Sequence, residues 1–99
     1  MAKNKSYNQL AYPKYNRIKK KLPPLLVKSI NKAENEIAKN PSIGTQKHSD
    51  LKGLCVHKFK PFDQKLLLAY EVNNKKKEVI FIAIGGHENF YRDLKQYLK

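Results

Sequence analysis

The chain has 99 residues, enough for one small domain with a single two-layer core and too few for two domains. It carries 21 lysines and arginines against 8 acidic residues, a net charge of +13, so self-repulsion disfavours the compact chain unless a polyanion is bound. Its one cysteine, Cys55, cannot form an internal disulfide, and no segment approaches the roughly 20 apolar residues of a membrane span. We therefore expect a cytoplasmic protein that binds nucleic acid or an acidic protein and has no membrane partner.

The first residues predict a short strand followed by a helix. Residues 6–12 alternate loosely, as an edge strand does, and Pro13 ends that strand because it lacks the donor that a sheet needs. Residues 14–21 place Tyr15 and Ile18 three positions apart among basic side chains. This spacing indicates about two turns of helix with cationic outer faces.

A second helix follows the Pro23-Pro24 pair and ends before Pro41. Proline is tolerated in a first helical turn, and it pushes the residue before it out of the helical region. Between these prolines the apolar positions recur at helical spacing: Leu22, Leu26, Ile30, Ala33 and Ile37. The stripe predicts a helix of roughly four turns that covers a sheet, with Glu34 and Glu36 on its outer side.

The rest of the chain predicts three strands and a closing helix. Residues 42–50 are expected to form a loop, residues 51–60 and 65–72 two strands joined by a turn, and residues 78–85 a third strand. Gly85 and Gly86 are expected to end that strand, and residues 89–98 to form a helix. The predicted order is β-α-α-β-β-β-α in a single α+β domain over residues 1–99, with residues 1–5 mobile.

The end of the last strand is the first candidate site. His87 follows it where the helix is expected to begin, and histidine, with an unperturbed pKa near 6.5, is the usual proton-transfer side chain at neutral pH. Tyr91 comes one helical turn later and falls on the same side. The competing interpretation is a histidine that bonds the backbone at the helix N-terminus, with Tyr91 packing against the core.

The strand over residues 51–60 supplies a second candidate group. Alternation places Lys58 and Lys60 on one face about 7 Å apart, which roughly matches successive phosphates of single-stranded RNA; a plain solvated face is the alternative. His57 falls on the opposite face beside Phe59, which favours a core or edge histidine. Asp63, in the turn that follows, could pair with His57.

The sequence predicts neither a metal nor a cofactor. Three histidines and one cysteine stand at spacings that form no recognisable metal site, and His48 has no identifiable partner. Gly85-Gly86 lacks the further glycine and lysine of a phosphate-binding loop.

Four segments together resemble the RelE/ParE superfamily of bacterial toxins: Leu51-Lys52-Gly53, Lys58-Phe59-Lys60, Leu-Leu-Leu-Ala-Tyr-Glu-Val and Ile-Gly-Gly-His-Glu-Asn-Phe-Tyr. The similarity covers roughly residues 6–98 and is most specific in the second half. It implies the toxin of a type II toxin-antitoxin system. Its fold would pack an N-terminal strand and a helical hairpin on a mainly antiparallel sheet and end in a helix.

In the RelE-type ribonucleases of this superfamily, strand lysines, a basic residue after the last strand and a following aromatic residue act on mRNA in the ribosomal A site. The resemblance therefore assigns catalytic roles to Lys58, Lys60, His87 and Tyr91. Lys52, Lys65 and Arg92 would bind RNA. The YafQ-like branch relies more on histidines and an aspartate, which would make His57 and Asp63 secondary catalytic residues. The chain departs from the RelE pattern at Leu67, where many members have an arginine; Lys65 is the nearest substitute.

Two functions follow from the resemblance. The first is a metal-independent, ribosome-associated mRNA endoribonuclease that inhibits translation, in which a 2′-hydroxyl attacks the adjacent phosphorus and His87 transfers a proton. The second is a ParE-like, non-catalytic inhibitor of DNA gyrase, which Leu67 favours. Both imply an acidic antitoxin that wraps the helical hairpin over residues 14–39 and the sheet edge.

Overall fold

A computed structural model gives the structure of the protein and describes residues 6–47, 53–86, 90 and 94. Along the chain, the described elements are β1 (Asn8–Ala11), α1 (Pro13–Lys20), α2 (Pro24–Lys39), the 3₁₀ turn η1 (Pro41–Ile43), β2 (Thr45–Gln46), β3 (Cys55–Phe59), the 3₁₀ turn η3 (Pro61–Asp63), β4 (Leu66–Asn73) and β5 (Glu78–Gly86). The predicted α+β order is confirmed through the last strand. The helix expected over residues 89–98 lies outside the described residues, except for Phe90 and Leu94, which are both buried.

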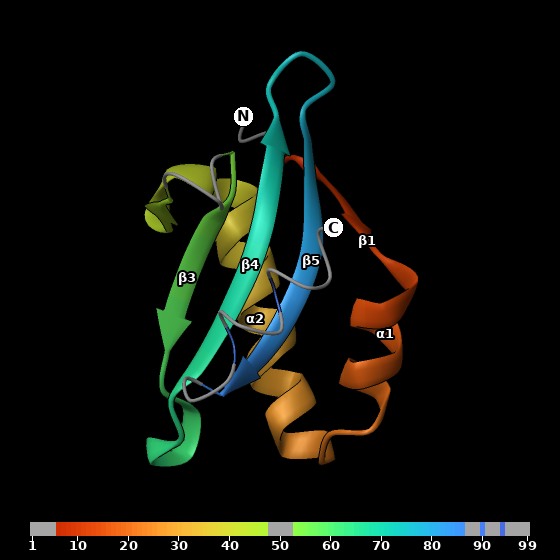
Figure 1. Ribbon diagram of the computed structural model, residues 1–99, viewed down its shortest axis with the longest axis vertical. Coiled ribbons are helices and arrows are strands. Elements are labelled where there is room, and N and C mark those ends of the chain that lie inside the picture. The colour runs from red at the N-terminus through yellow and green to blue at the C-terminus, as the bar shows by residue number, and fades with distance from the viewer. Residues whose placement is uncertain (1–5, 48–52, 87–89, 91–93, 95–99) are drawn as a thin grey trace.

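The strands form one sheet in the order β1-β5-β4-β3-β2 (Figure 1). β1 pairs with β5 in parallel and the other neighbours pair antiparallel, so the sheet is mainly antiparallel, as predicted. The two-residue strand β2 falls in the stretch expected to be a loop. Two residues are too few to show alternation, and their pairing with β3 depends on the tertiary fold.

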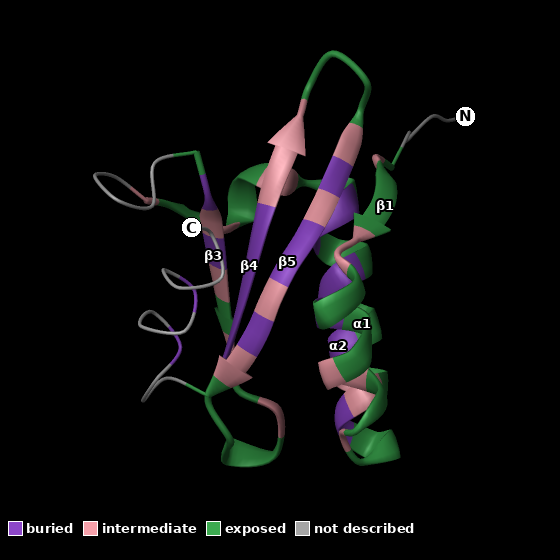
Figure 2. Ribbon diagram, turned by 45° about the vertical axis from the view of Figure 1, so that its right-hand side comes forward, coloured by how far each residue is buried: buried purple, intermediate pink, exposed green. Residues whose placement is uncertain are grey.

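Both helices pack on one face of the sheet (Figure 2). Four members of the predicted stripe are confirmed, because Leu26, Ile30, Ala33 and Ile37 are all buried in the core under the sheet, whereas Leu22 precedes α2 and is half-buried. α1 adds Tyr15, whose ring stacks on that of Phe81 in β5 with 5.7 Å between centroids. Removal of these apolar side chains from water is the main favourable term that holds the hairpin to the sheet. No helix in the described part is long and apolar enough to cross a membrane.

The prediction that Glu34 lies on the outer side of α2 is wrong, because this residue is only 7% exposed. Glu34 stands one turn after Ile30, on the flank of α2 that faces α1. Its carboxylate accepts hydrogen bonds from Tyr15 Oη at 2.6 Å and from Lys19 Nζ at 3.0 Å. A carboxylate can be buried there because its oxygens are satisfied by an ammonium and a phenol.

The opposite face of the sheet carries a second, smaller core, which contains Leu54, Val56, Leu67, Ala69, Ile82, Phe90 and Leu94. A β-bulge sets which residues of β5 reach it. Ala69 pairs with Ala83 and Tyr70 with Phe81, so Ile82 is an extra residue in β5. Ile82 and Ala83 therefore both pack on this face, while Phe81 packs with the helices.

β5 ends at Gly86, so the prediction that the two glycines end the last strand is confirmed to within one residue. Both glycines belong to β5 and stay in register with Leu67 and Leu66 of β4. The described glycine with a positive φ is Gly53, at 93°. β5 therefore includes both glycines, and Gly86 is the last described residue before His87.

Candidate functional site

The candidate site lies at the end of the sheet where β3 and β5 finish and β4 begins, at the bottom of Figure 1. Lys58 pairs with Leu67, and Leu67 pairs with Gly85, so these residues form one row across three strands. Neighbouring strands are about 4.8 Å apart, which places the backbone of Lys58 about 10 Å from that of Gly85. The row ends two residues before His87.

Three exposed lysines gather at this end, and we call Lys58, Lys60 and Lys65 the lysine cluster. Val56 packs in the second core and Cys55 and Phe59 pack with the helices. Lys58 therefore points away from the helices, as predicted, because side chains alternate along a strand.

The ladder between β3 and β4 brings the backbones of two of these lysines close together. Phe59 pairs with Leu66, so the next residues along each strand, Lys60 and Lys65, lie opposite one another where the ladder ends. Like charges directly opposite on a sheet are destabilising. Within the described part of the chain, no side chain of the lysine cluster has an ion-pair or hydrogen-bond partner. This arrangement attracts an anion.

Leu67, the residue at which the chain departs from the pattern of the resemblance, is fully buried in the second core. It lies between Lys58 and Gly85 in the row across the sheet. The middle of this row is therefore apolar and covered, and the exposed lysines stand at its rim.

His57 lies on the helix-facing side of β3, as alternation predicts. Its ring stacks on that of Phe59, with 5.5 Å between centroids and 13° between planes. Burial lowers the pKa of His57, while the Glu36 carboxylate opposes this shift, so the imidazole is mainly neutral at pH 7. Asp63 is exposed in η3, and no contact between described residues joins it to His57.

The remaining candidate residues, His87, Tyr91, Lys52 and Arg92, lie outside the described residues, as does His48, so their roles stay predictions. The described neighbour of His87 is Gly86, at the end of β5. Phe90 lies over Gly85, since a Cβ atom built on Gly85 would stand 3.7 Å from the Phe90 ring. No group of three His, Cys, Asp or Glu residues in the described part could hold a metal ion.

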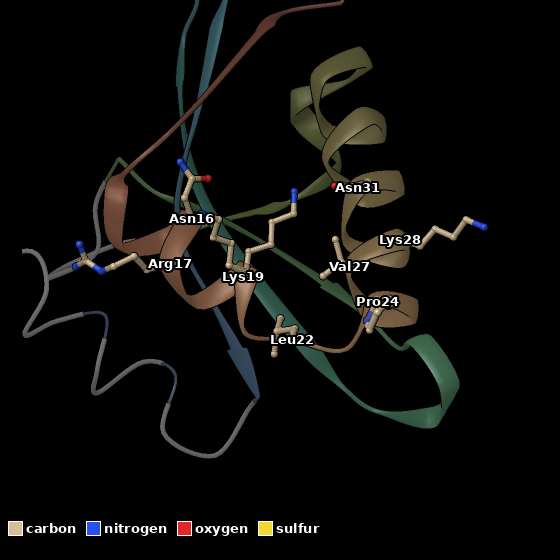
Figure 3. A pocket seen from close by; sticks show the side chains of 9 residues that line it. Asn16, Arg17, Lys19, Leu22, Pro24, Val27, Lys28 and Asn31 are labelled. Carbon is tan, nitrogen blue, oxygen red and sulfur yellow. The ribbon is translucent and has the colours of Figure 1, made fainter.

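A groove of about 790 Å³ runs between α1 and α2, on the helical side of the molecule (Figure 3). It is lined by the apolar residues Leu22 and Val27 and by basic residues, and the side chains of Arg17 and Lys28 point outward from it (Figure 3). Lys19 also lines it but is paired with Glu34. This groove belongs to the hairpin that the sequence predicted as an antitoxin-binding surface.

Sequence reasoning gave no role to Phe62 in η3, which is 67% exposed and has a positive φ of 54°. The available signal was an aromatic residue in a short turn flanked by lysines. Such a pattern cannot reveal exposure or backbone strain, because both depend on how the turn is closed.

A family model described as the ParE-like toxin of type II bacterial toxin-antitoxin systems matches residues 10–95. The chain belongs to this family. A comparison with curated proteins finds no match. Solved structures with the same fold include the toxin-antitoxin complex RelBE2 from Mycobacterium tuberculosis, with a TM-score of 0.75 and 16% identity over 88% of this chain and 98% of that one.

Two Escherichia coli structures are also similar to this ParE-like toxin. A doubly substituted RelE toxin in the free state has a TM-score of 0.74 and 18% identity over 94% of each chain. The intact RelBE toxin-antitoxin complex has a TM-score of 0.69 and 22% identity over 84% of this chain and 99% of that one. At this level of identity the comparison establishes a RelE-like fold.

Proposed function

We propose that this toxin is a metal-independent endoribonuclease that cleaves translated mRNA in the cytoplasm and so inhibits translation. The observation that carries the proposal is the lysine cluster, which places three exposed lysines at the end of the sheet where β5 finishes. An inhibitor that works through surface contacts has no need for this arrangement. A bound phosphodiester would remove the repulsion between Lys60 and Lys65.

The proposed chemistry uses the RNA itself as the nucleophile. The 2′-hydroxyl attacks the adjacent phosphorus, the bond to the 5′-oxygen breaks, and one group takes a proton while another supplies one. Lys58 and Lys60 would hold the non-bridging phosphate oxygens, which gain negative charge in the transition state. His87, which follows Gly85 by two residues in the sequence, would transfer a proton. Tyr91 would stack or relay a proton. Because His57 faces the helices, we propose it and Asp63 only as secondary residues.

The alternative is a ParE-like inhibitor of DNA gyrase, and Leu67 is the observation that favours it. A buried leucine in the row between Lys58 and Gly85 leaves the centre of the site without a cation. The lysines on the rim can still reach a phosphate, because a lysine side chain is long and flexible. We therefore keep the ribonuclease as the preferred function.

We further propose an acidic antitoxin as the protein partner. The solved complexes RelBE2 and RelBE are toxin-antitoxin complexes, and the groove between α1 and α2 is lined by both apolar and basic residues. A partially disordered acidic chain that orders on binding would satisfy both features.

Primer extension on an mRNA that is being translated in vitro tests the proposal. Replacement of both Lys58 and Lys60 by alanine should lower the cleavage rate by about 10²- to 10³-fold, and His87→Ala by about 10²- to 10⁴-fold. The matched control replaces Lys75 and Lys76, which are exposed in the β4–β5 turn at the other end of the sheet, and should cleave normally. Loss of gyrase supercoiling with intact mRNA would establish the alternative instead.

A further inference from the structure

The turn η3 stands next to the lysine cluster. It joins β3 to β4, so Lys60 precedes it directly and Lys65 follows it by two residues. Its central residue is Phe62, and the sequence assigns no function to this side chain.

Phe62 contributes little to either core. It is 67% exposed, more than the other large exposed apolar side chains of the described residues, which are Leu10, Leu25 and Ile43. It belongs to neither of the two buried clusters. The ring therefore gains little free energy from burial in the isolated chain.

The backbone at Phe62 is also unfavourable. Its φ and ψ are 54° and 39°, and the next residue, Asp63, has a φ of 63°. Aspartate tolerates the left-handed region, whereas a bulky aromatic residue rarely adopts it. The turn is closed on both sides of the ring, by the fixed φ of Pro61 and by a 2.9 Å hydrogen bond from the Gln64 N–H to the Pro61 carbonyl. Strain of this kind concentrates at functional sites.

We infer that Phe62 is a substrate-stacking residue, whose ring packs on a base of the single-stranded RNA that the lysine cluster binds. Proteins that bind single strands combine cations for the backbone with exposed aromatic rings for the bases. Here both occur within one turn: Phe62 is two residues from Lys60 and three from Lys65. The inference deepens the proposed ribonuclease function and rests on it.

An acidic protein is the other occupant that this chemistry admits, but the surroundings of Phe62 favour RNA. A protein contact of useful strength buries a cluster of apolar side chains. Among the described residues of β3, η3 and the start of β4, Phe62 is the single large apolar side chain that is exposed. A lone ring between Lys60 and Lys65, with Asp63 as the one carboxylate in the turn, suits a base and its phosphates better.

Phe62→Asn separates stacking from folding, because asparagine accepts a positive φ and has no aromatic ring. The probe is a single strand of about eight nucleotides, 2′-O-methylated so that it cannot be cleaved, with 2-aminopurine at each position in turn. We expect Phe62→Asn to weaken binding by about 10- to 100-fold and to abolish the change in 2-aminopurine emission. Its melting temperature should equal or exceed that of the wild type, because strain is relieved.

Two further variants complete the experiment. Phe62→Tyr should retain both affinity and the emission change, since a phenol ring also stacks. Leu25→Ala removes an apolar side chain that is 64% exposed on α2 and should leave RNA binding unchanged.

Unchanged RNA affinity and emission in Phe62→Asn would overturn the inference while leaving the ribonuclease proposal intact. Loss of antitoxin binding alone in this variant would also overturn it, because Phe62 would then be a protein contact. If the wild-type chain neither binds the strand nor cleaves translated mRNA, the proposed function fails and stacking fails with it.

Discussion

Gly44 has no room for a side chain, and no motif in the sequence indicates this. Its N–H donates a 3.0 Å hydrogen bond to Tyr70 Oη, which in turn donates a 2.6 Å bond to the Pro41 carbonyl. A Cβ atom on Gly44 would collide with this phenol oxygen. The two hydrogen bonds fix η1 to Tyr70 of β4. Burial is the main cause that raises the pKa of Tyr70 to about 12. The phenol therefore stays protonated throughout the neutral range.

We predict that Gly44→Ala lowers the free energy of unfolding by about 1–3 kcal/mol, because Tyr70 must move and lose hydrogen bonds. Gly86→Ala is the control, since a Cβ atom there meets none of the described residues within 4 Å, and it should change stability by less than about 0.5 kcal/mol. Urea unfolding monitored by circular dichroism measures both. Equal midpoints for the two variants would contradict the packing around Tyr70.

His57 gives the chain a pH-dependent stability on the acidic side. Burial lowers its pKa in the folded state below the unfolded value of 6.5. The contribution of neutral His57 is therefore complete above pH 6.5 and declines as the pH falls below it, because the unfolded chain then binds the proton more readily. We predict that His57→Gln reduces the loss of unfolding free energy between pH 7 and pH 5. An identical pH profile for the variant would show that His57 titrates as an exposed side chain.

At the scale of elements, α1 is held to α2 by a polar contact as well as by apolar packing. Tyr15 and Lys19 of α1 share the carboxylate of Glu34 on α2. Burial, followed by the nearby Glu34 carboxylate, raises the pKa of Tyr15, so this hydrogen bond persists at all neutral pH values.

We predict that Tyr15→Phe destabilises the protein by about 1.5–3 kcal/mol, the usual range for a hydrogen bond to a charged group. In a double-mutant cycle with Glu34→Gln, the two changes should be less than additive by at least about 0.5 kcal/mol. Lys20→Ala serves as the control, because Lys20 is exposed and has no partner among the described residues. Strict additivity in urea unfolding would mean that Tyr15 acts through its ring alone.

The elements that the sequence predicts well are those with a one-dimensional signature. The stripe from Leu26 to Ile37 fixes the buried side of α2, and alternation over β3 correctly puts Lys58 and His57 on opposite faces. The features that were missed arise from contacts between elements. Glu34 is buried because α1 supplies its partners, and Ile82 is an extra residue because β4 and β5 bulge. No local pattern reports either event.

The same reasoning explains how much of the candidate site was predictable. Alternation and the resemblance identify Lys58 and Lys60 as neighbours on one face. The position of Lys65 opposite Lys60 depends on the register of β3 with β4, and the register is set by packing of the whole sheet. The exposure of Phe62 depends on how η3 closes. These facts require the tertiary structure.

For the molecule as a whole, the charge of +13 is distributed unevenly. The first acidic residue in the chain is Glu34, and its carboxylate is already engaged by Tyr15 and Lys19. The cations of α1 and the first half of α2 are therefore almost unopposed. A polyanion such as RNA releases its condensed counterions when it binds the chain. Its binding should therefore weaken steeply as salt is added.

This leads to a prediction that separates the lysine cluster from the general positive charge. For a single-stranded RNA, the logarithm of the binding constant falls linearly with the logarithm of the salt concentration, with a slope of about −0.7 for each phosphate contact. Lys58→Ala should therefore make the slope shallower by about 0.7 as well as lower the affinity. Lys75→Ala removes the same charge from the β4–β5 turn at the far end of the sheet and should leave the slope unchanged. Fluorescence anisotropy from 50 to 300 mM salt measures both slopes. The same shift in both variants would mean that RNA responds to net charge rather than to the site at the end of β5.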